Sequence, residues 1–456
     1  MDFPVIYAKQ ALLPSGWALD VRLEIDTGTM RRIETGTSAR HGDTCVDTLL
    51  PALGNLHSHA FQRAMAGMTE VRQAGRDSFW TWRSLMYRFM SQLTPKQMQA
   101  IAALVYVEMQ EAGFASVGEF HYLHHQTGGA PYDDPSELSQ RIFAAAAQTG
   151  IGLTHLPVLY SYGGAGKTAL SAGQMRFGND MDRFLRLHDA ATEGLRALPP
   201  DARIGIAPHS LRATAPDDLA QVLAAHSEGP VHIHIAEQPK EVEDIQHWLG
   251  ERPVAWLLDN IGVDARWCLI HATHMTASET RDMARSGAIA GLCPITEANL
   301  GDGPFHGPEY LNAGGRFGVG SDSNVNISLT EELRTLEYSQ RLRDGARNVM
   351  VRGEGSVGQA LYTGAARGGA MALARDAGEI AVGRLADLVA IDSTAPALCA
   401  LRPDQVLDGL VFAAKDDVVT DLWSAGRHMV QGGRHLHREA VLTAYRDAMT
   451  GLLASV

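Results

Sequence analysis

Two histidines separated by a single residue follow an apolar segment near the start of the chain. The sequence there reads LLPALGNLHSHAFQRAMAG, with the imidazoles at His57 and His59. Alternate side chains of a strand point to the same face, so the two rings can project together from the end of a strand. Such a pair could bind one metal ion, or it could be two solvated histidines of a loop.

Three later segments place more metal-type donors at the ends of apolar stretches. VHIHIAEQ contains His232, His234 and Glu237, WCLIHA contains His271, and GVGSDSN contains Asp322. Imidazoles combined with a carboxylate suit zinc or ferrous iron better than calcium or magnesium. Any one of these histidines alone is more often structural. Their recurrence at several strand ends favours a metal site.

These donors can meet only if the segments before them are neighbouring strands. From about residue 51 to 375, apolar strands alternate with helical stretches, such as the helix that Thr94 can cap with Pro95 in its first turn. Eight β-then-α units favour an α/β fold built on a closed (β/α)8 TIM-like barrel with its site at the carboxyl ends of the strands, and a doubly wound open sheet is the alternative. The first strand ends at His59 and the others are expected at 115–120, 151–159, 203–209, 231–237, 267–272, 288–294 and 316–322.

The two ends of the chain have a different pattern. Residues 1–50 alternate apolar and polar positions, as in WALDVRLEID, and the pattern returns at 376–435, as in DVVTDLWSAGRHMVQGG. We expect the two parts to form one small discontinuous β-sandwich domain beside a barrel at 51–375. The last segment, 436–456, is expected to be a C-terminal helix.

Composition and charge narrow the class of protein. The formal charge of −13 argues against nucleic acid as a partner, because phosphate binding needs a basic surface. The four cysteines form no CxxC pair, which argues against a thiolate zinc site and fits a reducing compartment. The N-terminus resembles no secretion signal and no apolar run is long enough to span a bilayer. We therefore expect a cytoplasmic protein without membrane contact.

The arrangement HxH, HxxE, H and D resembles the amidohydrolase superfamily over nearly the whole chain, including the GRLADLV tail at Gly383–Val389. Within the superfamily, HSHAFQRAMAG followed by FWTWR is similar to the formimidoylglutamate deiminases, or N-formimino-L-glutamate iminohydrolases, of histidine degradation. The arrangement HxH, HxxE, H and D is typical of the deaminating branch of the superfamily. The glutamine of HSHAFQ and the arginine of FWTWR are the residues that favour the formimidoylglutamate deiminases within that branch.

The resemblance implies one divalent metal, zinc in the first place and ferrous iron as the alternative. Its ligands would be His57, His59, His234 and Asp322, with His232 hydrogen-bonded in the core instead. Relatives with two metals need a bridging lysine on the fourth strand, and the stretch RIGIAPH contains none. A single metal of this kind makes a water molecule nucleophilic near neutral pH.

The resemblance also implies the catalytic groups. Glu237 would carry protons between the attacking water and the departing nitrogen, and His271 would hydrogen-bond the nucleophile or the tetrahedral intermediate. Asp322 would be a metal ligand and also accept the proton of the water. The implied reaction is hydrolytic deimination of N-formimino-L-glutamate to N-formyl-L-glutamate and ammonia.

A small anionic substrate derived from an amino acid requires fixed donors for two carboxylates. The implied substrate-binding set is Gln62, Arg83, Tyr122, His209 and Arg212, with Arg83 in a long loop after the first strand. By itself, each arginine is more often part of a surface ion pair. The family also implies a homodimer.

Two other functions fit parts of the pattern. A deaminase of a nucleobase or related heterocycle would use the same metal machinery, with an aromatic slot instead of two arginines. A non-catalytic barrel serving as a scaffold is the other alternative, although such a protein would be expected to have lost ligands. The aromatic run of Phe79, Trp80 and Trp82 could cap the site or pack against a neighbouring subunit.

Overall fold

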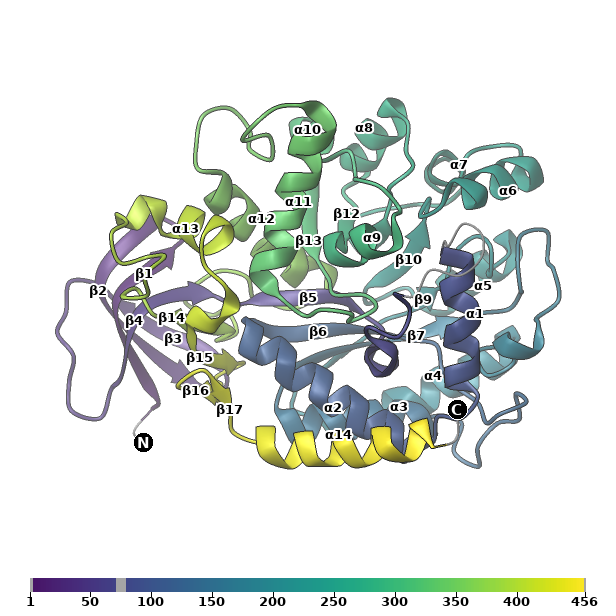
Figure 1. Ribbon diagram of the computed structural model, residues 1–456, viewed down its shortest axis with the longest axis horizontal. Coiled ribbons are helices and arrows are strands. Elements are labelled where there is room, and N and C mark those ends of the chain that lie inside the picture. Colours follow the sequence, from purple (N-terminus) through teal and green to yellow (C-terminus); the bar gives the residue numbers. More distant parts are fainter. Residues whose placement is uncertain (1–2, 71–78, 455–456) are drawn as a thin grey trace.

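The computed structural model describes residues 3–70 and 79–454, except for the side chains at 79–82, 84 and 85. An antiparallel-rich sheet built from an N-terminal and a C-terminal segment lies beside a larger α/β part, as Figure 1 shows. Among the described helices, none combines the length and the apolar character that crossing a bilayer requires.

The terminal segments form one eight-stranded sheet in the order β17-β16-β15-β14-β4-β1-β2-β3. Strand β1 pairs with β2 antiparallel and with β4 parallel. Strand β4 pairs with β14 antiparallel, and this pairing joins the N-terminal strands to the C-terminal strands. These strands form one hydrogen-bonded sheet, which agrees with a small sheet domain beside the α/β part. Its strands are β1 Val5–Leu13, β2 Gly16–Asp26, β3 Thr29–Glu34, β4 Thr44–Pro51, β14 Leu388–Ile391, β15 Val419–Ser424, β16 Arg427–Gln431 and β17 Arg434–His435.

Two parallel sheets form the strands of the larger part. One has the order β5-β6-β7-β8, with β9 paired to β7, and the other the order β10-β11-β12-β13. Isolated parallel bridges link them, Ser58 with Asp322 on one side and Ile206 with Val231 on the other. The strands are β5 Leu53–Ser58, β6 Phe114–His121, β7 Gly152–Leu159, β8 Arg203–Ile204, β9 Ala207–Pro208, β10 Val231–Ile235, β11 Trp267–His271, β12 Ile289–Leu292 and β13 Arg316–Val319.

These strands confirm the predicted positions, with one difference at 203–209. The expected strand is broken into β8 and β9, because its backbone changes partner at this point. Gly205 donates its amide hydrogen to the carbonyl of His155 in β7 (2.9 Å), and Ile206 donates to the carbonyl of Pro230 before β10 (3.0 Å). A side chain at Gly205 would meet the Pro230 carbonyl oxygen at 2.3 Å, so glycine permits this close approach.

Helices cover the parallel strands (Figure 1). The predicted capped helix is confirmed as α2, where Thr94 accepts a hydrogen bond from the amide of Gln97. The expected loop around Arg83 is wrong, because α1 occupies this segment and buries Met86, Phe89 and Met90. The α-helices are α1 Phe79–Met90, α2 Pro95–Ala112, α3 Glu137–Thr149, α4 Met181–Leu195, α5 Pro216–Ala225, α6 Pro239–Leu249, α7 Pro253–Asn260, α8 Ala277–Ser286, α9 Pro294–Leu300, α10 Gly307–Asn312, α11 Leu329–Asp344, α12 Val357–Ala372, α13 Val406–Phe412 and α14 Arg438–Leu453, and the 3-10 turns are η1 Ala60–Met65, η2 Ala172–Gln174, η3 Pro403–Gln405 and η4 Asp416–Val418.

A buried ionic network joins the eight-stranded sheet to the α/β part. Arg375 lies after α12 with a fully buried side chain, 3.0 Å from Asp387 and 3.1 Å from Asp201 (guanidinium nitrogen to carboxylate oxygen). Arg427 of β16 reaches the other oxygen of Asp201 at 2.8 Å. Burial opposes ionisation of Asp201, but Arg427 and Arg375 outweigh it and lower the pKa of this carboxyl below its ordinary value.

Replacement of Arg375 is therefore expected to destabilise the fold. Arg375→Met leaves Asp387 buried without its cation, and breaking a buried pair typically costs about 3–5 kcal/mol. The midpoint of chemical unfolding measures the loss. Arg384→Met is the matched control, because its partner Asp376 is exposed and such pairs contribute about 1 kcal/mol or less. Equal shifts in the two variants would contradict the structural role of this network.

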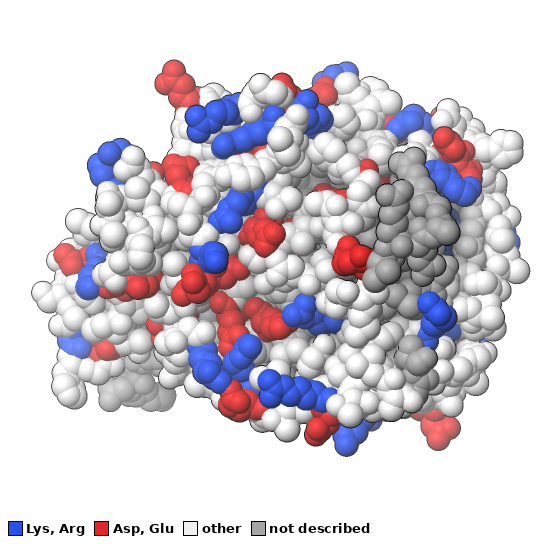
Figure 2. Space-filling view, in the orientation of Figure 1, with Lys and Arg blue, Asp and Glu red and all other residues white. Residues whose placement is uncertain are grey.

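Surface charge is mixed on the face shown in Figure 2. Lysine and arginine side chains lie among aspartate and glutamate side chains across the described part of this face. This distribution differs from the single basic surface that tracks a nucleic-acid backbone.

Candidate active site

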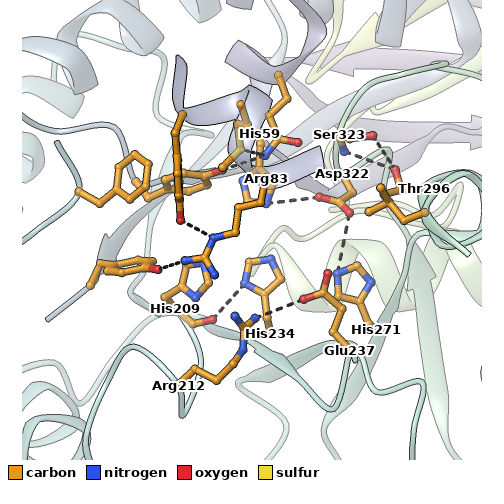
Figure 3. A pocket seen from close by; sticks show the side chains of 17 residues that line it. His59, Arg83, His209, Arg212, His234, Glu237, His271, Thr296, Asp322 and Ser323 are labelled. Atoms are coloured by element: carbon orange, nitrogen blue, oxygen red, sulfur yellow. Dashed lines mark hydrogen bonds and ion pairs between the residues drawn. The ribbon is translucent and has the colours of Figure 1, made fainter. Parts of the chain in front are cut away.

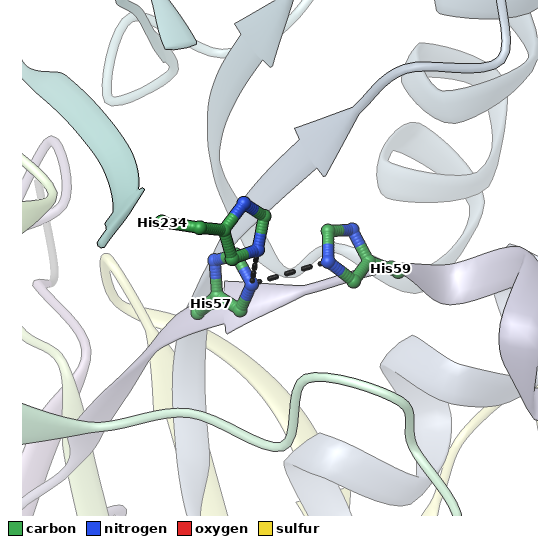
Figure 4. A group of neighbouring side chains, drawn as sticks. All are labelled: His57, His59 and His234. Atoms are coloured by element: carbon green, nitrogen blue, oxygen red, sulfur yellow. Dashed lines mark hydrogen bonds between the residues drawn. The ribbon is translucent and has the colours of Figure 1, made fainter. Parts of the chain in front are cut away.

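Three imidazoles converge at the carboxyl ends of β5 and β10. His57 is in β5, His59 follows that strand directly, and His234 is in β10. The Nε2 atom of His57 lies 3.2 Å from Nε2 of His59 and 3.1 Å from Nε2 of His234. Figure 4 shows the three rings pointing toward one another. All three side chains are buried.

Backbone carbonyls fix the protonation of two of these rings. Nδ1 of His59 lies 2.9 Å from the Phe120 carbonyl oxygen, and Nδ1 of His234 lies 3.0 Å from that of His209. A carbonyl only accepts, so each Nδ1 carries the hydrogen and each neutral ring presents a lone pair at Nε2. Burial lowers the pKa of both rings and takes that of His57 to about 3, which keeps them neutral.

Asp322 adds a carboxylate to the same point. Its Oδ1 lies 3.3 Å from Nε2 of His59 and 3.6 Å from Nε2 of His57. The backbone holds it there, since its amide donates to the His57 carbonyl and its carbonyl accepts from the His59 amide, both at 2.9 Å. Its left-handed φ of 45° is uncommon for a residue with a side chain and is a feature of functional sites.

The donor set fits a divalent cation. His59 and His234 each direct a lone pair at the ring of His57, which can donate at most one hydrogen from Nε2. The carboxylate of Asp322 faces the same point. Hydrogen bonds alone therefore leave lone pairs without a partner, and a cation would bind them. Cys293 also lies near His271 and Asp322. Burial raises the pKa of its thiol well above the ordinary value.

His232 lies on the same strand as His234 but has a different environment. Its Nε2 donates to the carbonyl of Ala372 at 2.8 Å, and the ring is fully buried in the core. The predicted hydrogen-bonded position of His232 is confirmed.

Glu237 and His271 lie beside this cluster. A guanidinium nitrogen of Arg212 is 3.4 Å from Oε2 of Glu237, and burial raises the pKa of that carboxyl. Nε2 of His271 lies 3.8 Å from Oδ2 of Asp322. Burial opposes protonation of His271, but the surrounding carboxylates, Glu297 first among them, outweigh it and raise its pKa to about 10.

Glu297 is a site residue that the sequence interpretation missed. Its Oε1 lies 3.3 Å from Nδ1 of His271 and accepts the amide hydrogen of Cys293 at 2.9 Å. Glu297 therefore fixes the ring of His271 through Nδ1, on the side away from the Nε2 atom that faces Asp322. The available signal was an acidic residue in the first turn of a helix that begins at Pro294.

The proposed substrate-binding residues line one cavity with the metal-type residues. Figure 3 shows Arg83, His209 and Arg212 facing this space together with Glu237 and Asp322. Gln62 donates to the hydroxyl of Tyr122 at 2.8 Å. Of the predicted site residues, His57 is buried beside His59 and His234 without lining the cavity. The others line it: His59, Gln62, Arg83, Tyr122, His209, Arg212, His234, Glu237, His271 and Asp322.

Other lining residues had no signal in the sequence. They come from several elements and include Met86, Tyr87, Tyr160, Phe177, Thr296, Leu300 and Ser323. Arg63 does not line the cavity and instead pairs with Glu108 at 3.0 Å. The side chains of Phe79, Trp80 and Trp82 lie outside the described part of the chain.

Comparison with known proteins places this geometry in a family. The model of the amidohydrolase family matches residues 48–429, and that of the N-terminal domain of formimidoylglutamate deiminase HutF matches 3–46. Formimidoylglutamate deiminase of Pseudomonas aeruginosa is 49% identical over 451 residues, covering 98% of this chain and 99% of the relative. The chain belongs to the formimidoylglutamate deiminases of the amidohydrolase family.

Solved structures agree with this assignment. The crystal structure of an amidohydrolase from Brucella melitensis has a TM-score of 0.95 and 51% identity, over 99% of this chain and 100% of the other. An adenosine deaminase from Xanthomonas campestris with bound zinc has a TM-score of 0.81 at 21% identity, over 99% of both chains, which shows a shared fold. Amidohydrolases are metal-dependent, and this formimidoylglutamate deiminase has a histidine-rich cluster suited to a metal.

Proposed function

We propose that this protein hydrolyses N-formimino-L-glutamate to N-formyl-L-glutamate and ammonia, a step of histidine degradation. The near full-length similarity to a formimidoylglutamate deiminase supports this substrate. The observation that carries the proposal is one cavity lined by metal-type histidines, a buried carboxyl and two arginines. The reaction breaks a carbon–nitrogen bond, consumes one water molecule and releases one ammonia molecule.

His57, His59, His234 and Asp322 would hold one divalent metal, zinc in the first place and ferrous iron as the alternative. When bound, such a metal supplies Lewis acidity that makes water nucleophilic near neutral pH. The carbonyls of Phe120 and His209 hold the rings of His59 and His234 with Nε2 facing Nε2 of His57, where the metal would be held. Such outer hydrogen bonds orient ligands and support metal affinity.

Glu237 would move the protons of the reaction. Burial raises its pKa above the ordinary value of a carboxyl, which makes it easier to protonate and suits a group that passes a proton to a departing amine. Asp322 would accept a proton from the attacking water at the metal-facing side. His271, held from behind by Glu297, would stabilise the tetrahedral intermediate through Nε2.

Five polar residues that line the cavity would bind the two carboxylates of the substrate. Arg83 and Arg212 supply the positive charge, since a doubly negative substrate leaves water only when fixed cationic donors replace its hydration. Gln62, Tyr122 and His209 would add hydrogen bonds. A flat uncharged heterocycle would offer no carboxylate for the two arginines to bind, which favours the amino-acid derivative over a nucleobase.

Replacement of Arg212 is expected to impair both binding and turnover. Its guanidinium lies 3.4 Å from Glu237 and 3.6 Å from Glu241, so Arg212→Met removes a carboxylate donor and also leaves two buried acids without their cation. We expect kcat/KM for formiminoglutamate to fall by roughly 100-fold or more, with changes in kcat as well as KM. The control is Arg88→Met, an exposed position on α1. Unchanged KM and kcat in Arg212→Met would contradict the proposed clamp.

A screen of ammonia release tests the substrate directly. Metal-replete protein is offered formiminoglutamate, other formimino amino acids, and nucleobases such as guanine and cytosine. We expect the highest kcat/KM for formiminoglutamate. Faster release from a nucleobase would support the heterocycle deaminase instead, and absence of both bound metal and turnover would support a non-catalytic scaffold.

The architecture and assembly are further proposals. The cyclic neighbour order of the parallel strands and the two linking bridges support a closed (β/α)8 barrel over 51–375. The sheet domain would comprise 1–50 and 376–435, followed by a C-terminal helix at 436–456. A cytoplasmic homodimer is proposed from the family, and light scattering of the purified protein tests the dimer.

A further inference from the structure

Tyr160 lines the active-site cavity and has no role so far. It follows β7 directly and its side chain is buried. Its ring packs against His209 and Phe177, with centroid distances of 4.6 and 5.5 Å. The packing fixes the ring, and its hydroxyl lies close to Arg83.

Two nitrogen donors point at this hydroxyl oxygen. Nη2 of Arg83 and Nε2 of Gln174 each lie 2.9 Å from it. A guanidinium has no lone pair to accept a hydrogen, and neither has the nitrogen of an amide. Both groups therefore donate to Tyr160, and its own hydroxyl hydrogen needs a different acceptor.

The orientation of the Gln174 amide is fixed independently. Its Oε1 accepts the backbone amide hydrogen of Ser171 at 2.9 Å, and its Nε2 also faces the carbonyl oxygen of Gly163 at 3.2 Å. A backbone amide only donates and a carbonyl only accepts, so exchange of the oxygen and nitrogen of Gln174 would break both bonds. The assignment of Nε2 toward Tyr160 follows.

We propose that Tyr160 is a further substrate-binding residue, which donates its hydroxyl hydrogen to the substrate carboxylate beside Arg83. Within residues 3–70 and 79–454, no hydrogen bond has the Tyr160 hydroxyl as its donor, and Tyr160 lines the cavity. A carboxylate placed there receives one hydrogen bond from a cation and one from a phenol. Gln174, in η2, is the positioning residue that holds the phenol oxygen in place.

The hydrogen bond from Gln174 to Tyr160 gives the glycine-rich connection after β7 a function. The stretch SYGGAGKTA and the turn that follows it bring Gln174 back to Tyr160. The connection thereby fixes the direction from which Gln174 donates to the Tyr160 oxygen, and it leaves the hydroxyl hydrogen of Tyr160 for a ligand. Tyr160 therefore distinguishes substrates with a carboxylate at this place from those without one. This inference rests on the proposed function.

The test compares Tyr160→Phe with wild type on three substrates. They are N-formimino-L-glutamate, N-formimino-4-aminobutyrate, which lacks the α-carboxylate, and N-formimino-L-2-aminobutyrate, which lacks the side-chain carboxylate. Loss of a hydrogen bond to a charged group is expected to reduce kcat/KM for formiminoglutamate by roughly 10- to 100-fold, mainly through KM. The reduction should persist for one analogue and nearly vanish for the analogue that lacks the contacted carboxylate.

Two controls separate direct donation from a structural effect. Tyr162→Phe makes the same chemical change two residues away, outside the cavity lining, and should leave all three substrates unaffected. In an Arg83→Met background, Tyr160→Phe should still weaken binding of the product N-formyl-L-glutamate, measured by calorimetry. Loss of that second effect would mean that Tyr160 acts only through Arg83 and would overturn the proposal.

The outcomes distinguish this inference from the proposed function. A wild-type protein that fails to convert formiminoglutamate overturns the function and the inference with it. Wild-type conversion, with Tyr160→Phe unchanged or equally impaired on all three substrates, overturns the inference alone.

Discussion

Glu237→Gln is expected to abolish most of the turnover while the protein keeps its metal. The amide has the shape of the carboxyl and can still accept a hydrogen bond from Arg212, which lies 3.4 Å away in the native protein. It cannot take up and return a proton. Since general acid–base groups contribute about 10²- to 10⁴-fold, kcat should fall by that factor. Ammonia release and metal content of the same sample measure both parts of the prediction.

Glu243→Gln on α6 is the matched control, because this carboxylate is exposed. It should have wild-type kcat. Glu237→Ala should keep the metal as well and lose turnover. A Glu237→Gln variant with more than a tenth of wild-type kcat would mean that another group carries the proton.

His234→Ala is expected to lose the metal, whereas His232→Ala is expected to keep it. His234 presents its Nε2 toward His57 at 3.1 Å, while His232 donates to the Ala372 carbonyl at 2.8 Å. Loss of an outer hydrogen bond to a ligand costs about 10- to 100-fold in metal affinity, so loss of a direct ligand should cost at least roughly 100-fold. Metal content after dialysis, followed by ammonia release, measures the difference.

The two substitutions differ in what they damage. His232→Ala removes a buried donor and should cost roughly 1–3 kcal/mol of folding stability without changing metal stoichiometry. Full metal content in folded His234→Ala, or its loss in folded His232→Ala, would contradict the assignment of ligands along β10.

The sequence was sufficient to predict the donor cluster because its signals are local. The period of two in HSH and VHIH determines which side chains share a face of a strand, and the apolar stretches mark where strands end. The backbone bonds between Asp322 and His57 show why these ends meet. Spacing thus predicted that these donors meet, whereas the choice of His234 over His232 as a metal ligand was implied by the family resemblance.

The rest of the site depends on contacts between distant loops, which leave no periodic signal. Glu297 reaches His271 from a short helix, and Gln174 reaches Tyr160 from a connection of irregular structure. The family resemblance implied that Arg212 binds substrate, and the fold also places it beside Glu237 and Glu241. The break at Gly205 was unpredictable for the same reason, because it arises from the partner change toward Pro230.

Contacts that the sequence does not show also explain why the segment around Arg83 was wrongly predicted as a loop. Its helix buries Met86, Phe89 and Met90, which follow the spacing of one helical face. The short segment carries several aromatic residues as well, and these suited a loop over a site equally well. Packing against the core decided in favour of the helix.

Identification of the products in ¹⁸O-labelled water tests the central proposal most directly. Collapse of the tetrahedral intermediate can break either carbon–nitrogen bond, giving N-formyl-L-glutamate and ammonia, or L-glutamate and formamide. We predict N-formyl-L-glutamate labelled in its formyl oxygen, with one equivalent of ammonia. Formation of glutamate and formamide, or recovery of unchanged substrate from metal-replete protein, would contradict hydrolytic deimination.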